Sequence, residues 1–164
     1  MKKRLLSLIL CMVMVLSVFP FTVSAENSEI SVVNLSGAKN ALSAEMVEDY
    51  KNAVAISNNG DKRYYVKYVN CYEAYDKSMM YGKDKFFPGV DYYLRISLYP
   101  NEGYPFPYDT SEITVSMDGS PVKAENIKTY VSSSQKNARY AEITIPFTTP
   151  GKRVDYITDL YFTV

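Results

Sequence analysis

Apolar and polar side chains alternate along several short stretches of the chain, and the clearest alternation spans Tyr92–Tyr99. A period of two is typical of a β-strand that is buried on one face. The residues expected to face the core are Tyr92, Leu94, Ile96 and Leu98. Because burial of each would contribute roughly 1.5–3 kcal/mol before conformational entropy is subtracted, we expect this strand at the centre of the core.

Further stretches of β-branched and aromatic residues, bounded by turn residues, occur along most of the chain. The additional expected strands are Glu29–Leu35, Arg63–Tyr72, Ile113–Met117, Pro121–Ala124, Arg139–Phe147 and Val154–Val164. Asp118-Gly119 supplies the positive φ angles of a tight hairpin turn. Seven or eight short strands predict an all-β fold, an antiparallel β-sandwich.

Three connections between these strands have a mixed or polar composition. In Ala38–Ile56, alanines and acidic residues favour a helix, whereas β-branched and aromatic residues favour a strand; we predict a strand after an irregular loop, with a helix as the alternative. Glu73–Lys85 has the length of a crossover between two sheets rather than of a tight hairpin. Glu125–Asn137 is polar and predicts an exposed loop.

The N-terminal residues 1–25 have the pattern of a secretory signal peptide. A basic start is followed by the apolar run Leu5–Phe21 and by small residues in Val23–Ala25. The alternative is a retained membrane anchor, because the apolar run approaches the length that spans a bilayer. We predict cleavage before Glu26, which gives a single secreted domain, residues 26–164, that is extracellular or held at the cell surface and not inserted in the membrane.

Charge and the scarcity of certain residues exclude several classes of function. The chain has 18 basic and 18 acidic residues, and removal of Lys2, Lys3 and Arg4 leaves 15 basic against 18 acidic residues. This balance argues against nucleic acid as a partner. The absence of histidine excludes triads with an imidazole base and the usual zinc sites. Cys71 would be the only cysteine after cleavage, and we expect it to be buried rather than paired between chains.

Acidic residues lie close together at two places, which raises the question of catalysis. Glu73 with Asp76, and Asp109 with Glu112, are candidate pairs for hydrolysis of a glycosidic bond. A chain with 18 acidic residues produces such neighbours by chance. Asn58–Asp61 has oxygen ligands of the kind calcium prefers but not the spacing of a known calcium loop, so we interpret it as a turn. We therefore predict no enzymatic activity, no cofactor and no metal.

Tyrosine is the unusual feature of the composition, with 16 residues and no tryptophan. Tyrosine suits contacts with sugars or with a protein partner, because an apolar ring carries a polar tip. If Cys71 faces the core, the opposite face of its strand carries most of a candidate site. The predicted ligand-binding residues are Tyr64, Tyr68, Asn70 and Tyr72, extended by Tyr93 and Tyr99 on a neighbouring strand. The alternative is that this face is covered within the sandwich.

One pattern resembles the immunoglobulin-like modules of secreted and cell-wall proteins of Gram-positive bacteria. Its elements are Phe86-x-x-Gly89-x-x-Tyr92 with the alternation that follows, Gly103-Tyr104-x-Phe106, and a strand that ends in Asp118-Gly119. Two positions differ: Asp118 replaces the usual asparagine, and Cys71 stands near the place of a buried tryptophan. The resemblance implies an immunoglobulin-like fold and an accessory or adhesive role outside the cell, and it transfers no catalytic residue.

These observations together predict a secreted, non-catalytic binding or adhesion module. Its partner would be an extracellular glycan or a surface protein, recognised through the tyrosine-rich face. The alternative is a structural protein that assembles with copies of itself through strand edges or Cys71, and the third interpretation is a carboxylate-based hydrolase. The sequence predicts no oligomeric state.

Overall fold

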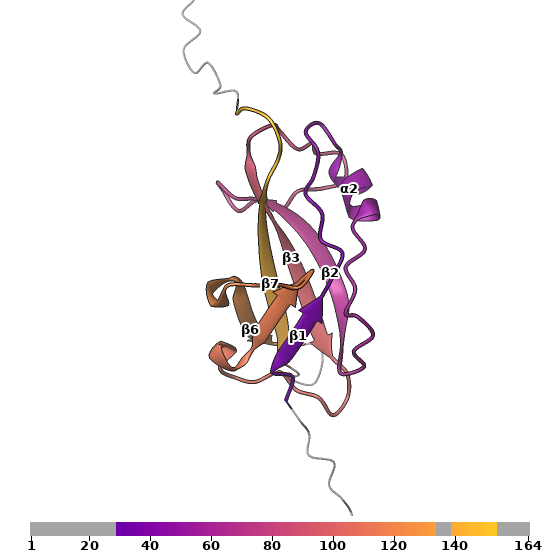
Figure 1. The fold of residues 1–164 in the computed structure, drawn as a ribbon, viewed down its shortest axis with the longest axis vertical. Helices are drawn as coiled ribbons and strands as arrows, with labels where there is room; N and C mark the ends of the chain where they lie inside the picture. The colour runs from indigo at the N-terminus through magenta and orange to yellow at the C-terminus, as the bar shows by residue number, and fades with distance from the viewer. Residues whose placement is uncertain (1–28, 134–138, 154–164) are drawn as a thin grey trace, which may run out of the picture.

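The computed structural model describes residues 29–133 and 139–153, so the proposed signal peptide and the strand predicted at Val154–Val164 lie outside the described residues. In this part of the chain, no helix is both long and apolar enough to cross a membrane. The elements are β1 (Val32–Leu35), α2 (Val47–Ala53), β2 (Tyr64–Glu73), β3 (Asp91–Pro100), the 3-10 turn η1 (Thr110–Glu112), β4 (Thr114–Met117), β5 (Ser120–Pro121), the 3-10 turn η2 (Ala124–Asn126), β6 (Ile127–Val131) and β7 (Arg139–Thr148) (Figure 1).

The strands form two sheets, so the prediction of a mostly-β chain is confirmed. One sheet has the order β2-β3-β7-β6 and is antiparallel throughout. The other has the order β1-β4-β5, and β1 lies in front of β2, β3 and β7 in Figure 1. The prediction of an entirely antiparallel arrangement is wrong, because β1 runs parallel to β4. All of β2 and β3 lies between these two strands in the chain, which provides the long connection that a parallel pair requires.

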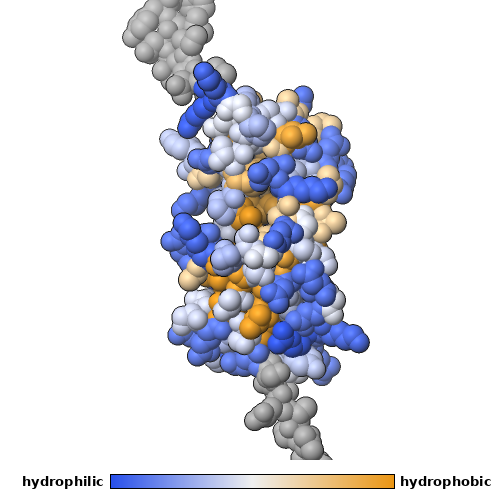
Figure 2. Space-filling model, viewed as in Figure 1, coloured by the Kyte–Doolittle hydropathy of each residue, from blue (hydrophilic) through white to orange (hydrophobic). Residues whose placement is uncertain are grey.

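Both sheets contribute side chains to one core cluster. Its members include Val33 and Leu35 of β1, Val115 of β4, and Ile96 and Leu98 of β3. Tyr92, Leu94, Ile96 and Leu98 are all buried, so the prediction that this strand is central to the core is confirmed. On the side seen in Figure 2, hydrophobic residues gather toward the middle of the molecule and hydrophilic residues surround them.

A second cluster lies at the other end of β3; we call it the aromatic cluster, because four of its ten buried residues are aromatic. The ring of Phe86 packs edge-on against Tyr50 and Tyr92, at centroid distances of 5.2 and 5.0 Å, and Phe147 completes the group. Tyr50 belongs to α2, and its hydroxyl donates a hydrogen bond to the carbonyl of Lys39. The aromatic rings therefore attach the helix to the four-stranded sheet.

The strand predicted within Ala38–Ile56 is wrong, because this segment contains α2. The helix buries Val47 and Tyr50, which are three residues apart and so share a face. Its acidic first turn suits the positive end of the helix dipole. A helix of seven residues is too short to show a clear period in the sequence, and its stability depends on the aromatic cluster.

Two other predicted connections are also wrong. Glu73–Lys85 does not cross between sheets, because it joins β2 and β3, which are neighbours in the same sheet. The loop predicted at Glu125–Asn137 contains β6, which pairs with β7 along Ile127–Val131. β6 is an edge strand with a single buried residue, Ile127. Its β-branched and aromatic residues favour a strand, but they form a short run inside an otherwise polar segment.

The predicted hairpin at Asp118-Gly119 is confirmed. β4 and β5 pair antiparallel around this turn, in which Asp118 and Gly119 have φ angles of 51° and 79°. The Asp118 carboxylate also accepts hydrogen bonds from the backbone N–H groups of Gly37 and Ala38, at 2.7 and 3.1 Å. Aspartate at this position therefore fixes the chain where it leaves β1, which asparagine, with one carbonyl oxygen, would do less fully.

A β-bulge in β2 changes which side chains face the core. Val66 lies opposite Leu98 and Tyr68 lies opposite Ser97, so Lys67 is an extra residue without a partner across the ladder. Insertion of one residue moves every later side chain to the other face. Tyr64 and Cys71 therefore both point inward, although seven positions separate them.

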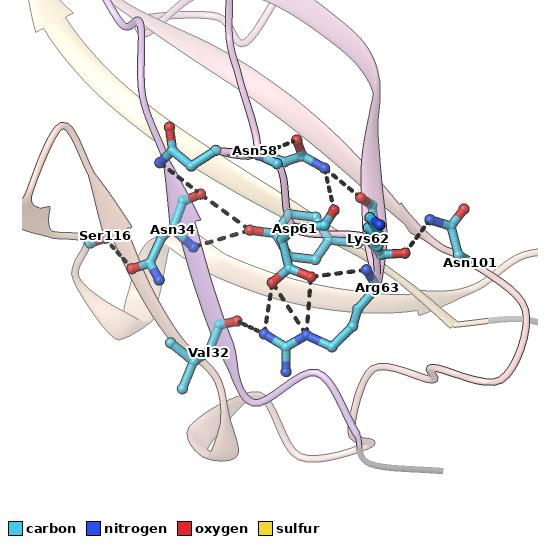
Figure 3. A network of polar contacts seen from close by, with 11 residues as sticks. Val32, Asn34, Asn58, Asp61, Lys62, Arg63, Asn101 and Ser116 are labelled. Atoms are coloured by element: carbon cyan, nitrogen blue, oxygen red, sulfur yellow. Dashed lines mark hydrogen bonds and ion pairs between the residues drawn. The ribbon is translucent and has the colours of Figure 1, made fainter. Parts of the chain in front are cut away.

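The hydroxyl of the inward-facing Tyr64 hydrogen-bonds to backbone groups at the free edge of β1. This hydroxyl accepts a hydrogen bond from the backbone N–H of Asn34 (3.1 Å) and donates one to the carbonyl of Asn34 (3.2 Å). Arg63, which is paired with Asp61 at 2.7 Å, donates to the carbonyl of Val32 (Figure 3). The hydrogen bonds from Arg63 hold the pKa of the Asp61 carboxyl below its usual range. The segment before β2 thus takes the place of a neighbouring strand along β1.

We expect Tyr64→Phe to lower the free energy of unfolding by about 1–3 kcal/mol, because it removes a hydroxyl that satisfies both backbone groups of Asn34. Urea denaturation measures the change. Tyr65→Phe is the matched control, since Tyr65 is the next residue and lies half-exposed on the other face, and its cost should stay within about 0.5 kcal/mol. Equal costs for the two variants would contradict this role of Tyr64.

Candidate functional site

The four-stranded sheet carries a surface rich in tyrosine on the face opposite the core. We call it the outer tyrosine face; its residues are Tyr65, Lys67, Tyr68, Asn70 and Tyr72 of β2, Asp91, Tyr93, Arg95, Ser97 and Tyr99 of β3, Tyr140, Glu142, Thr144, Pro146 and Thr148 of β7, and Lys128 and Tyr130 of β6. Residues directly opposite one another across a ladder share a face of the sheet. The register therefore brings side chains from all four strands onto one surface.

A row of stacked tyrosine rings crosses this face from one edge of the sheet to the other. Tyr65 lies against Tyr99 at a centroid distance of 6.2 Å, and Tyr99 stacks on Tyr140 at 4.9 Å with the ring planes 7° apart. Tyr140 stacks in turn on Tyr130 at 5.4 Å. The two stacked pairs, at 4.9 and 5.4 Å, approach the spacing of neighbouring strands, about 4.7–4.9 Å, whereas Tyr65 and Tyr99 are farther apart and tilted by 34°. Each strand supplies one ring of the row.

A second aromatic group lies farther along the same face. Tyr72 and Tyr93 stack at 5.1 Å with planes only 2° apart, and the guanidinium of Arg95 lies 4.2 Å from the centroid of Tyr72. The Nε of Arg95 is 3.8 Å from a carboxylate oxygen of Glu142. Arg95 is thus held between aromatic rings and a carboxylate, an arrangement that positions its remaining N–H donors.

Mutual stacking determines which parts of the tyrosine rings meet the solvent. In a stack between adjacent strands the ring faces point along the sheet, so the edges and hydroxyl groups point away from it. Burial raises the pKa of the Tyr140 hydroxyl. A phenol is protonated at physiological pH even without this shift, so the tyrosine hydroxyls of this face can donate hydrogen bonds. Tyr68 differs, since it meets Tyr99 edge to face at 6.4 Å and is 52% exposed. The surface therefore offers hydroxyls and ring edges more than flat ring faces.

Five of the six predicted ligand-binding residues lie together on the outer tyrosine face: Tyr68, Asn70, Tyr72, Tyr93 and Tyr99. The placement of Tyr64 on this face is wrong, because the bulge at Lys67 turns it inward and leaves it 1% exposed. Tyr65 occupies the expected place of Tyr64 opposite Tyr99. Ligand binding by the five residues on this face stays a prediction.

Sequence reasoning missed Tyr65, Tyr130 and Tyr140 as members of this surface. One signal for Tyr140 was present: it is out of phase with the apolar series of its strand, as expected for an outward residue. Tyr130 was not considered, because Glu125–Asn137 was predicted as a loop although Ile127–Val131 contains β-branched and aromatic residues. The missing information was the register between strands, which depends on contacts far apart in the sequence.

The aspartates of the two acidic pairs considered for glycoside hydrolysis lie outside the outer tyrosine face and make local hydrogen bonds. Asp76 accepts a hydrogen bond from the backbone N–H of Ser78, and Asp109 accepts one from that of Ser111. These bonds lower the pKa of both carboxyls. A general acid in glycoside hydrolysis needs the opposite shift.

Cys71 is fully buried, as predicted, and burial raises the pKa of its thiol to about 11. A thiol with such a pKa is neutral at physiological pH and is a poor nucleophile. Its position inside the aromatic cluster also keeps it from a disulfide with another chain.

The turn Asn58–Asp61, considered as a calcium loop, uses its oxygen and nitrogen atoms within the chain. Asn58 donates hydrogen bonds to the carbonyls of Asp61 and Tyr64, and Asp61 is paired with Arg63 (Figure 3). Within residues 29–133 and 139–153, no three acidic or cysteine side chains gather closely enough to hold a metal ion. The prediction that the protein binds no metal stays a prediction.

A pocket of about 470 Å³ lies beside the turn that follows β2, away from the tyrosine row. Its lining includes Glu73, Tyr75, Phe87, Asp91 and Arg153. Tyr75 is 89% exposed and belongs to this loop region rather than to the sheet. Variants of Tyr75 therefore distinguish a general effect of exposed tyrosines from an effect of the outer tyrosine face.

Comparisons of the chain with protein-family models, with curated proteins and with solved structures found no match. The functional interpretation therefore depends on the surface itself.

Proposed function

We propose that this protein is a secreted, non-catalytic binding or adhesion module that recognises an extracellular partner through the outer tyrosine face. Residues 1–25 would act as the signal peptide. Residues 26–164 would form an immunoglobulin-like β-sandwich domain, in line with the sequence pattern that extends from Phe86 to Gly119. The protein would act outside the cell or at its surface.

One observation carries the proposal: the row Tyr65, Tyr99, Tyr140 and Tyr130 extends across the whole width of the sheet. Aromatic rings on an outward sheet face are not needed to fill the core, which β3 and the second sheet already supply. Rigid rings with few rotatable bonds lose little entropy when they contact a partner. Such a surface is therefore suited to recognition.

Two features favour binding of a different molecule over self-assembly. The free edge of β1 is already occupied by Tyr64 and Arg63, so addition of a strand there would break existing hydrogen bonds. Cys71 is buried within the aromatic cluster. Assembly through the edge of β1 or through Cys71 would therefore require local unfolding at these positions.

We expect the double variant Tyr99→Leu/Tyr140→Leu to weaken retention on a panel of polysaccharides and cell-wall material by more than about tenfold, because central aromatic residues dominate binding energies. Leucine keeps an apolar side chain on the sheet but removes the ring and the hydroxyl. Thermal unfolding of each variant establishes that the fold is retained.

The matched control is Tyr75→Leu/Tyr81→Leu, which removes two exposed tyrosines outside the strands. We expect this control to bind like the unaltered protein. Loss of binding in the control, or full binding by the variant in the tyrosine row, would contradict the proposal.

A further inference from the structure

The outer tyrosine face carries an excess of positive charge in a chain whose charges balance. Lys67, Arg95 and Lys128 point outward from the sheet, and two carboxylates oppose them: Glu142 among them, and Asp91 at the start of β3. The Nζ of Lys67 lies 5.8 Å from the ring centroid of Tyr68 and 5.7 Å from that of Tyr99. The positive groups are thus interleaved with the tyrosine rings.

A fourth positive group reaches the same face from the helix. The Nζ of Lys51 in α2 lies 3.5 Å from the side-chain oxygen of Asn70, at the edge formed by β2. Cations therefore occur at both edges of the sheet, with Lys51 and Lys67 toward β2 and Lys128 on β6. An extended anion that crossed the strands would meet a positive group at each end.

The orientation of the rings adds to this preference. The edge of an aromatic ring is electropositive and its face electronegative, and in the stacked row the faces are turned toward neighbouring rings. The hydroxyls at the ring tips donate hydrogen bonds to acceptor oxygens. Ring edges, phenol donors and ammonium or guanidinium groups all favour a ligand rich in negatively charged and acceptor oxygens.

Arg95 is the group best prepared for such a ligand. Its guanidinium stacks on Tyr72, and its Nη atoms make only long contacts, of 3.4 and 3.5 Å, with the hydroxyls of Tyr72 and Tyr93. Donors held in place by long hydrogen bonds retain capacity for a stronger, charge-assisted bond to a carboxylate. The carboxylate of Glu142 lies 3.8 Å from the Nε of Arg95, so it contacts a different nitrogen and leaves the two Nη groups available.

We infer that the ligand of the outer tyrosine face is an anionic polysaccharide that bears carboxylate groups; this inference rests on the function proposed above. A sugar polymer supplies many hydroxyl oxygens for the phenol groups and repeated carboxylates for the cations. The outward positions of the four strands that make up this face carry no leucine, isoleucine, valine or methionine. The face thus offers hydrogen-bond donors and cations, which match a polymer rich in hydroxyl and carboxylate oxygens. Tyrosine and arginine are also common in protein interfaces, so an acidic protein segment is the competing ligand that the test includes.

The test compares binding of the full-length exported protein to three immobilised probes: polygalacturonate as a carboxylate polysaccharide, dextran as a neutral one and poly-L-glutamate as an acidic polypeptide. We expect selective binding to polygalacturonate that weakens as salt is raised. Lys67→Gln/Lys128→Gln should weaken this binding about three- to tenfold, as expected for two exposed charge contacts. The matched control Lys39→Gln/Lys152→Gln removes two exposed lysines outside the strands and should leave binding unchanged.

Each remaining outcome overturns a specific statement. In one outcome the protein binds dextran as well as polygalacturonate, and Tyr99→Leu/Tyr140→Leu abolishes the binding while Lys67→Gln/Lys128→Gln does not. This result overturns the anionic ligand but keeps the outer tyrosine face as the binding surface. Equal or tighter binding to poly-L-glutamate replaces the polysaccharide with an acidic protein segment. Binding to polygalacturonate that survives in the folded tyrosine variant overturns both the inference and the proposed function, and no binding to any of the three probes overturns the inference.

Discussion

Gly37→Ala should lower the free energy of unfolding by about 3–5 kcal/mol, one of the largest effects that a single methyl group can have in this protein. Gly37 follows β1 with a φ angle of +95°, and a Cβ there would lie 2.2 Å from the carbonyl oxygen of Ala55 and 3.0 Å from its carbon. Both are backbone atoms, so they cannot move aside as the end of a flexible side chain does. The substitution also disturbs the hydrogen bond from the Gly37 N–H to Asp118.

Gly60→Ala separates the clash from the backbone strain. Gly60 also has a positive φ angle, +79°, but a Cβ there would meet no atom within 4 Å. Its cost should therefore be only about 1–2 kcal/mol, the penalty of a left-handed conformation for a residue with a side chain. Chemical denaturation of the two variants gives the difference, and equal costs would show that the chain after β1 can move away from Ala55.

Phe86→Ala should lower the free energy of unfolding by about 3–5 kcal/mol, because it leaves a cavity at the centre of the aromatic cluster. The ring is buried and contacts Tyr50, Tyr92 and Phe147. Loss of the ring also removes one of the contacts that hold α2, although Tyr50 keeps its ring contact with Phe147 at 5.7 Å. Urea unfolding should show a lower midpoint with an unchanged slope.

The adjacent residue provides the control for this variant. Phe87 is 54% exposed, so Phe87→Ala should change the free energy of unfolding by less than about 1 kcal/mol. The pair differs by one position in sequence and by burial in the structure. A similar cost for both variants would contradict the assignment of Phe86 to the core.

The sequence predicted those parts of the fold that are encoded locally. The alternation in Tyr92–Tyr99 and the Asp118-Gly119 turn each involve neighbouring residues, and β3 and the β4–β5 hairpin follow from them. α2 was given only as the alternative to a strand and β6 was missed, because a seven-residue helix and a short edge strand depend on contacts with distant residues. The parallel pairing of β1 with β4 was missed for the same reason.

The candidate site was predicted in part, and its one misplaced residue has a single physical cause. Tyr68, Asn70 and Tyr72 keep the expected phase relative to Cys71, whereas Tyr64 lies before the bulge at Lys67 and has the opposite phase. A single extra residue in a strand leaves no recognisable mark in the alternation, because aromatic and β-branched residues occupy both faces of β2. The stacked row itself required the register of all four strands.

The most direct test of the account is to map the contact surface on the unaltered protein with NMR. The labelled protein is titrated with oligosaccharides from the panel polymer that binds it best, and the chemical-shift changes of backbone amides and tyrosine rings are followed. The account predicts that the changes concentrate at Tyr68, Tyr99, Tyr140 and their neighbours on the outer tyrosine face. Changes concentrated at Tyr75 and Phe87, or on β1 and β4, with the tyrosine row unaffected, would contradict it.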